Sequence, residues 1–164
     1  MAVMTMTTPP SVDAMNGALD SVRDHLTELN TARDAAIGQS RELIRHCAEC
    51  IRAIHRQEWD TAQAKFEVIR TKADALRATV ADYPELYHTG YTQDALKEVV
   101  EAHMTYAIIR QEPLPTRDEL QAEPSTYLLG LAEAATELRR FILDIMRREA
   151  EQSAEAERLL DWMD

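Results

Sequence analysis

Two pairs of glutamates have the spacing of a metal site built from carboxylate oxygens. Glu98 and Glu101 lie three positions apart, and Glu133 and Glu137 lie four positions apart, so each pair shares one face of a helix. Mg²⁺ and Mn²⁺ prefer oxygen ligands, and a bound divalent ion can activate water and neutralise the charge that develops on a phosphodiester. The alternative is that these glutamates are surface acids or ion-pair partners of nearby arginines.

A row of arginines precedes these acids in the sequence. Arg41, Arg45, Arg52 and Arg56 fall at offsets 0, 4, 11 and 15, which at about 100° per residue place them within a sector of about 60° on one helix. Such a row can bind a phosphate backbone, and Arg140, which follows the second glutamate pair, can hold substrate or a neighbouring subunit. The alternative for the row is a solvated polar face held by salt bridges, and for Arg140 it is a polar face near a helix end, where cations suit the helix dipole.

Other sequence motifs are weak or missing. Cys47 and Cys50 form one C-x-x-C pair, but a zinc site needs four ligands, so we expect two buried reduced thiols. The sequence has no G-x-G-x-x-G, phosphate-binding loop, G-x-S-x-G or H-E-x-x-H motif. Its one E-x-x-H, from Glu85 to His88, does not make a ferritin-like di-iron site, which needs two such motifs.

The composition describes an acidic globular chain. The 164 residues include 18 basic and 29 acidic ones, a net charge of −11 that by itself predicts a protein repelling nucleic acid. Hydrophobic residues make up 45% of the chain, which excludes wholesale disorder, and no apolar run is long enough to span a membrane. We interpret residues 1–10 as a disordered N-terminal tail rather than a signal peptide, and we predict a cytoplasmic protein.

The apolar periodicity predicts that helices position all of these residues. A stripe of apolar residues at spacings of three and four runs from Leu19 to Ile54 on one long first helix, which Ser11 or Asp13 can cap and which can bend at Gly38. Further helices are expected at 58–80, at 92–110 with Thr92 as its cap, briefly after the capping-box pattern of 116–119, at 125–148, and within 149–163. The expected fold is all-α: an antiparallel bundle of five to six helices.

Three segments of the chain resemble the translin/TRAX family. Residues 41–56 are similar to the family's basic first-helix signature, and residues 95–102, ALKEVVEA, are similar to its LQEYVEA block with Lys for Gln and Val for Tyr. Residues 127–140, YLLGLAEAATELRR, resemble YLLGVADLTGELMR. The order and spacing of the three segments also match, and the likeness extends from about residue 19 to residue 163.

The resemblance implies a single translin-like helical domain over residues 11–164. It implies a closed, hollow homo-oligomer, often an octamer, that binds single-stranded RNA or DNA, and in the TRAX branch a Mg²⁺-dependent endoribonuclease. The family's catalytic carboxylates correspond to Glu98, Glu101, Glu133 and Glu137, with Glu133 standing where the family has Asp. Because all four positions are acidic, the chain resembles the nuclease branch more than the non-catalytic subunits.

Two functions follow as hypotheses. The first is a metal-dependent endoribonuclease of single strands, in which Glu98, Glu101 and Glu133 hold Mg²⁺ or Mn²⁺ and Glu137 is a ligand or general base. The arginines that would bind the nucleic acid are Arg41, Arg45, Arg52, Arg56 and Arg140. The second hypothesis is a non-catalytic oligomer that binds single-stranded nucleic acid. A purely structural helical protein with acids as surface decoration is a third.

Overall fold

Six helices make up the described part of the chain. The computed structural model describes residues 11–148 and 154–163. Its helices are α1 (Val12–His55), α2 (Trp59–Val80), α3 (Pro84–Tyr87), α4 (Gly90–Arg110), α5 (Pro124–Arg148) and α6 (Ala154–Asp161). No strand occurs among these residues, so the predicted all-α class is confirmed. The tail expected at residues 1–10 and the start of the segment expected from residue 149 lie outside the described residues.

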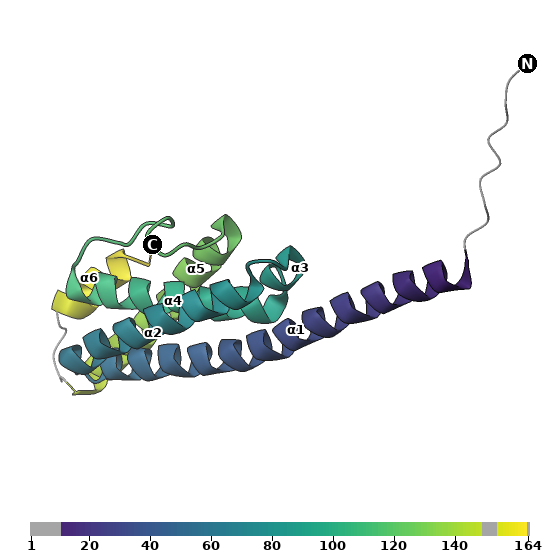
Figure 1. Ribbon diagram of the computed structural model, residues 1–164. Coiled ribbons are helices and arrows are strands. Elements are labelled where there is room, and N and C mark those ends of the chain that lie inside the picture. The colour runs from purple at the N-terminus through teal and green to yellow at the C-terminus, as the bar shows by residue number, and fades with distance from the viewer. Residues whose placement is uncertain (1–10, 149–153, 164) are drawn as a thin grey trace, which may run out of the picture.

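The long helix α1 spans 44 residues without a break. It begins where predicted, because the Ser11 hydroxyl accepts a hydrogen bond from the Ala14 N–H at 3.1 Å and so satisfies one free donor of the first turn. Gly38 does not interrupt it, and the helix continues through that residue to His55. Figure 1 shows that the second half of α1 runs along the bundle, whereas the first half extends well beyond it.

The bundle is formed by α1, α2, α4 and α5, with α6 closing one end. α1 packs against both α2 and α4, and α4 packs against α5, so α4 lies in the middle of the assembly. One apolar cluster draws on all five helices, with fully buried side chains such as Leu43, Ile69, Leu96, Leu138 and Leu159. Both cysteines are free and buried in this cluster, as predicted.

The connections differ from the sequence predictions in two places. Thr92 is not the cap of α4: the helix begins two residues earlier, and the Thr92 hydroxyl is buried and donates to the Leu86 carbonyl at 2.9 Å. The capping-box bonds of Thr116 and Glu119 do form, at 2.7 and 3.2 Å between backbone nitrogens and side-chain oxygens. These two hydrogen bonds hold a run of turns at residues 117–121, and the predicted brief helix does not form there.

Gly130 is the point at which α5 comes closest to α4. A Cβ added there would lie 2.6 Å from the Val100 Cβ and 2.8 Å from the Lys97 carbonyl oxygen. Any side chain would therefore push the two backbones apart, and only glycine permits this approach. Because Gly130 lies one helical turn before Glu133, the contact also sets how close the acids of α5 come to those of α4.

None of the helices in the described residues is both long and apolar enough to cross a lipid bilayer.

Candidate metal centre and nucleic-acid interface

Three of the four predicted carboxylates converge between α4 and α5. Glu98 and Glu101 from α4 and Glu133 from α5 each present one oxygen, and these oxygens lie within 4.8 Å of one another. The three side chains differ in exposure, from 7% for Glu101 through 23% for Glu98 to 40% for Glu133. The site is therefore open to solvent on the α5 side and closed at its base. We call these three residues the acidic cluster.

Glu101 forms the buried base of the acidic cluster. No hydrogen bond or ion pair reaches its carboxylate among the described residues, although the side chain is almost fully buried. Burial, together with the negative charges of Glu98 and Glu133, raises the pKa of Glu101 to about 7. The carboxylates of Glu98 and Glu133 repel that of Glu101 at this distance, so the surroundings of Glu101 suit a cation.

Lys97 supplies one positive charge to the acidic cluster. Its Nζ lies 2.5 Å from Glu133 Oε2 and 3.4 Å from Glu98 Oε1, so it bridges the two helices. Burial opposes the charge on this ammonium, but the hydrogen bond to Glu133 and the charge of Glu98 outweigh burial and raise the pKa of Lys97. The lysine stays charged and offsets part of the repulsion among the three acids.

Glu137, the fourth predicted acid, is held by a histidine and is not one of the three convergent ligands. Its Oε2 lies 2.5 Å from His55 Nε2 at the end of α1, and because a carboxylate only accepts, Nε2 is the donor. This hydrogen bond lowers the pKa of Glu137. The other ring nitrogen of His55 has no hydrogen-bond partner in the described residues and lies 3.9 Å from Asp144.

The acidic cluster fits a hard divalent cation such as Mg²⁺ or Mn²⁺. Its donors are all carboxylate oxygens, the ligand type these ions prefer, and three protein oxygens leave coordination positions for water or phosphate. The buried, donor-free Glu101 is the observation that favours a cation over a solvated surface patch. Glu98, Glu101 and Glu133 would hold the ion, with Glu137 beside them.

The predicted arginine row on α1 is exposed. Among the described residues it forms no ion pair with the acidic cluster. All four of its side chains are solvent-exposed; they are Arg41, Arg45, Arg52 and Arg56. Among the described residues Arg45 is paired with Glu42 at 3.8 Å, and the other three have no acidic partner. Three guanidinium groups on one helix, unpaired within residues 11–148 and 154–163, therefore remain available to a phosphate backbone.

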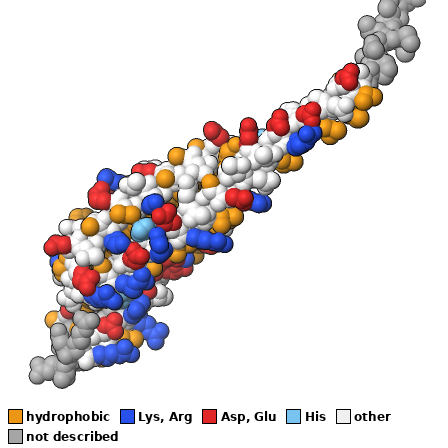
Figure 2. All heavy atoms as spheres, turned by 60° about the horizontal axis from the view of Figure 1, so that its bottom comes forward, with side chains coloured by type: hydrophobic (Ala, Val, Ile, Leu, Met, Phe, Trp, Pro, Cys, Tyr) orange, Lys and Arg blue, Asp and Glu red, His pale blue; other side chains and the backbone are white. Residues whose placement is uncertain are grey.

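Basic side chains also gather on the bundle itself. Figure 2 shows Lys and Arg side chains concentrated over the bundle end of one face, with acidic side chains between them. Groups of basic side chains are therefore exposed on a molecule whose net charge is −11, although acidic side chains lie among them.

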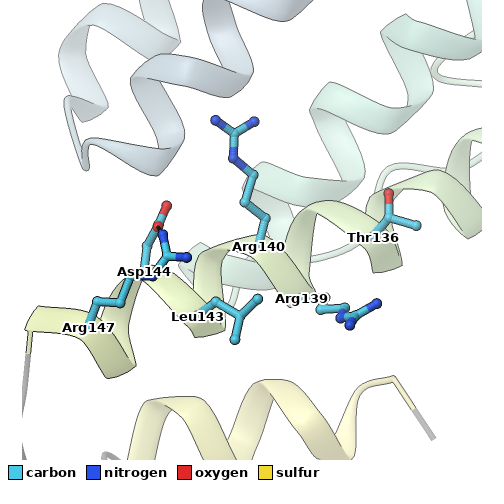
Figure 3. Close-up of a pocket in the computed structure, with 6 residues that line it drawn as sticks. All are labelled: Thr136, Arg139, Arg140, Leu143, Asp144 and Arg147. Carbon is cyan, nitrogen blue, oxygen red and sulfur yellow. Dashed lines mark ion pairs between the residues drawn. The ribbon is translucent and has the colours of Figure 1, made fainter.

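Arg140 is the predicted arginine that lies next to the acids. One of its nitrogens is 3.9 Å from Glu137, and its side chain remains 59% exposed. It borders a hollow of about 310 Å³ on α5, whose lining is Thr136, Arg139, Arg140, Leu143, Asp144 and Arg147. Figure 3 shows Arg140 and Arg139 pointing to different sides of α5. Phosphate held here would lie close to Glu137.

Two residues of this site had no assigned role in the sequence analysis. Lys97 was visible only as a replacement for Gln in the family block, and its position beside Glu98 does not show that it reaches Glu133 on another helix. His55 ends α1, 82 positions before its partner Glu137. Local spacing gives no signal for the contact of Lys97 with Glu133 or of His55 with Glu137, because each contact joins two helices that are distant in sequence.

The sequence and the structure were both compared with known proteins. No family model matches the sequence. A curated relative from Methanocaldococcus jannaschii, described as uncharacterized protein MJ0175, is 32% identical over 148 residues, which are 89% of this chain and 64% of that protein. The chain therefore spans less than two thirds of that relative's length.

Solved structures share the fold of this chain. The crystal structure of AfC3PO superposes with a TM-score of 0.79 and 28% sequence identity, over 89% of this chain and 74% of that one. C3PO is a complex of translin and TRAX. The chain has the translin-like fold and is similar to this family in sequence. The translin-like fold is also seen in apo-NeC3PO, at a TM-score of 0.69 and 20% identity over 88% of this chain and 89% of that chain.

A second structure of the AfC3PO chain contains nucleic acid. It is a complex with duplex RNA, and it superposes on this translin-like chain with a TM-score of 0.78 and 29% identity over 89% of this chain and 74% of that one. The family resemblance read from the three sequence segments is therefore confirmed. Membership of the TRAX branch stays a prediction.

Proposed function

We propose that this translin-like protein binds RNA and cleaves it as a metal-dependent endoribonuclease. The observation that supports the proposal is the convergence of Glu98, Glu101 and Glu133, with oxygens within 4.8 Å of one another around a buried carboxylate without a donor. RNA as the ligand is supported by the complex of the related AfC3PO with duplex RNA. The single-stranded preference, DNA binding and a cytoplasmic location remain predictions from the sequence.

Each residue of the site has a role in this proposal. A divalent ion at the acidic cluster would supply Lewis-acid chemistry to a phosphodiester. Glu98, Glu101 and Glu133 would hold the ion, with Glu101 as the buried base of the site. Glu137, kept ionised by its hydrogen bond to His55, can accept a proton from water.

The arginines position the strand. Arg140 lies beside Glu137 and can hold a phosphate near the site, while Arg41, Arg52 and Arg56 on α1 can bind phosphates further along. Arg45 is the fifth arginine of this set, and its ion pair with Glu42 must open before it contacts RNA.

Binding without cleavage is the second candidate function, and Lys97 favours it. Its ammonium already lies among the three carboxylates and contributes the positive charge that a metal ion would otherwise supply. If this arrangement keeps divalent ions out, the protein holds RNA and leaves it intact. Family assembly as a homo-oligomer, including an octamer, is compatible with either function and remains a prediction.

Cleavage of labelled RNA with and without Mg²⁺ tests the proposal. Purified protein is incubated with single-stranded and duplex RNA, beside the isosteric double variant Glu98→Gln/Glu101→Gln. We expect Mg²⁺-dependent cleavage by the native protein and a loss of at least about 100-fold in the variant, because two of three ligands lose their charge.

A matched double variant controls for the loss of two acids. Glu67→Gln/Glu85→Gln removes two exposed carboxylates outside the acidic cluster and should leave the rate unchanged. Equal cleavage by the native protein and Glu98→Gln/Glu101→Gln would assign the activity to a contaminant or another site. RNA binding that persists in EDTA, with no turnover in Mg²⁺ or Mn²⁺, would establish the non-catalytic function.

A further inference from the structure

The first half of α1 displays an apolar stripe that nothing in the described chain covers. Its large side chains are 50–69% exposed: Val12, Met15, Leu19, Val22 and Leu26. Figure 1 shows this half of the helix projecting from the bundle, and we call residues 12–29 the arm. An exposed stripe of this length on a rigid helix normally marks a contact surface.

The stripe has the seven-residue period of a coiled coil. Val12, Leu19 and Leu26 occupy one position of the repeat, and Met15, Val22 and the partly buried Leu29 occupy the position three residues later. This 3.5-residue spacing keeps an apolar seam in register with a second helix over three repeats. The partner that it fits is therefore another helix with the same repeat.

The same seam continues into the bundle, where helices do cover it. After Arg33 the repeat resumes, and its next six positions are all buried; they are Ala36, Ser40, Leu43, Cys47, Cys50 and Ile54. These residues face α2 and α4, which pack along the second half of α1. The arm is therefore the uncovered half of one continuous helix-packing surface.

The charges of the arm are arranged for contact with another acidic chain. Its four acids all fall on the face away from the seam; they are Asp13, Asp20, Asp24 and Glu28. The positions that flank the seam hold neutral residues, one histidine and Arg23, with no carboxylate among them. Figure 2 shows acidic side chains along one edge of the arm and hydrophobic ones along the other. Two copies can therefore meet at this seam without acid–acid repulsion.

We propose that the arm forms an antiparallel two-stranded coiled coil with the arm of a second copy of this chain. In one register all six seam residues find partners, because Val12 faces Leu29 of the second copy, Met15 faces Leu26, and Leu19 faces Val22. Each layer then combines Leu with Val or Met, so the layers have similar volumes. The helix is already formed and anchored by the bundle, which lowers the entropic cost of pairing.

The position of the bundle selects the antiparallel orientation. The bundle begins beside the seam directly after the arm, where α2 and α4 occupy the face that a partner helix would need. A parallel pair would bring both bundles to the same end and into the same space. An antiparallel pair places the two bundles at opposite ends of the coiled coil, which is about 27 Å long.

Sedimentation of the full chain over a wide range of protein concentration tests the pairing. Leu19→Glu/Leu26→Glu puts charges into the seam and should weaken the dimer by at least about tenfold in Kd. Ser21→Glu/Thr31→Glu adds the same charge to exposed positions off the seam and should leave Kd unchanged. A native chain that is monomeric at every concentration, or equal Kd values for the two variants, overturns the proposal.

Disulfide cross-linking tests the orientation. A mixture of Met15→Cys and Leu26→Cys chains should cross-link between copies, because these positions face each other in the antiparallel register. Met15→Cys alone should not, since the two Met15 positions would lie about 16 Å apart along the axis. The native cysteines are buried and should not react. Efficient cross-linking of Met15→Cys alone would establish a parallel pair and overturn the antiparallel arrangement.

Discussion

Lys97 is a built-in cation among the three carboxylates that would hold a metal ion. Its Nζ lies 2.5 Å from Glu133 and 3.4 Å from Glu98. A divalent ion held by the same oxygens would be roughly 5 Å from this ammonium, and even at the dielectric constant of water their repulsion is roughly 1.7 kcal/mol. The charge of Lys97 in this position therefore opposes metal binding.

Replacing Lys97 by Met should strengthen metal binding. Met keeps the length and the apolar stem of the side chain and removes its charge, so Lys97→Met should raise the affinity for Mn²⁺ by about tenfold or more. Titration of Mn²⁺ into the RNA-free protein, followed by the paramagnetic signal of free Mn²⁺, measures the effect without any cleavage assay.

Lys65 provides a matched control for this substitution. Its Nζ also lies 2.5 Å from a carboxylate, that of Glu49, and its side chain is 29% exposed against 16% for Lys97. Lys65→Met should leave Mn²⁺ affinity unchanged. A lower affinity in Lys97→Met would show that the lysine supports the metal site and does not compete with the ion.

For single residues, the sequence identified the four glutamates of the site but not the side chains that contact them. Spacing of three and four residues was enough to place Glu98 with Glu101 and Glu133 with Glu137 on helix faces. Spacing left open whether the two pairs converge on one site or lie on the surface, and the family resemblance favoured convergence; the structure brings together three of the four acids. The ammonium of Lys97 and the bond from His55 to Glu137 depend on how the helices pack, which local spacing does not encode.

The contact between α4 and α5 depends on one glycine. A Cβ at Gly130 would lie 2.6 Å from the Val100 Cβ, and Val100 is fully buried and cannot move aside. The two backbones would have to separate, and the separation would move Glu133 away from Glu98 and Glu101.

Gly130→Ala should destabilise the protein by about 1–3 kcal/mol despite the better helix propensity of Ala. Gly38→Ala is the control, because Gly38 lies within α1 and a Cβ there meets nothing within 4 Å. That change should stabilise by about 0.5–1 kcal/mol. Urea unfolding of both variants measures the difference, and a stabilised Gly130→Ala protein would refute the tight contact.

Helix positions were more predictable than helix ends. The apolar stripe and the Ser11 cap were sufficient for α1, since both are local signals. The pattern from Thr116 to Glu119 formed its hydrogen bonds but only turns, and Gln121, with a left-handed φ of 48°, follows them before α5 begins at Pro124. Thr92 is buried inside α4 because a one-turn helix, α3, precedes it and offers the Leu86 carbonyl.

The whole molecule is strongly acidic, so RNA binding must rely on local groups of arginines. Arg41 and Arg52 are exposed, belong to the same helix and have no acidic partner among the described residues. They should contribute to binding more than arginines that already have acidic partners, since an ion pair must open before phosphate can bind.

The salt dependence of RNA binding should reveal these contacts. The slope of log affinity against log salt should be shallower by about 1.4 in Arg41→Gln/Arg52→Gln, because each phosphate contact to a single strand contributes about 0.7. Arg70→Gln/Arg117→Gln removes two exposed arginines that are paired with Glu67 and Asp118, and should leave the slope unchanged. Identical slopes for all three proteins would exclude the α1 row from the interface.

The unbroken course of α1 has a consequence for how a dimer could meet its ligand. One rigid rod connects the seam of the arm to His55, the partner of Glu137. In the antiparallel pair the two His55 residues would lie roughly 100 Å apart, at a rise of about 1.5 Å per residue. A short oligonucleotide could then bind only one bundle at a time. Only strands long enough to reach both bundles would gain affinity from binding the two together.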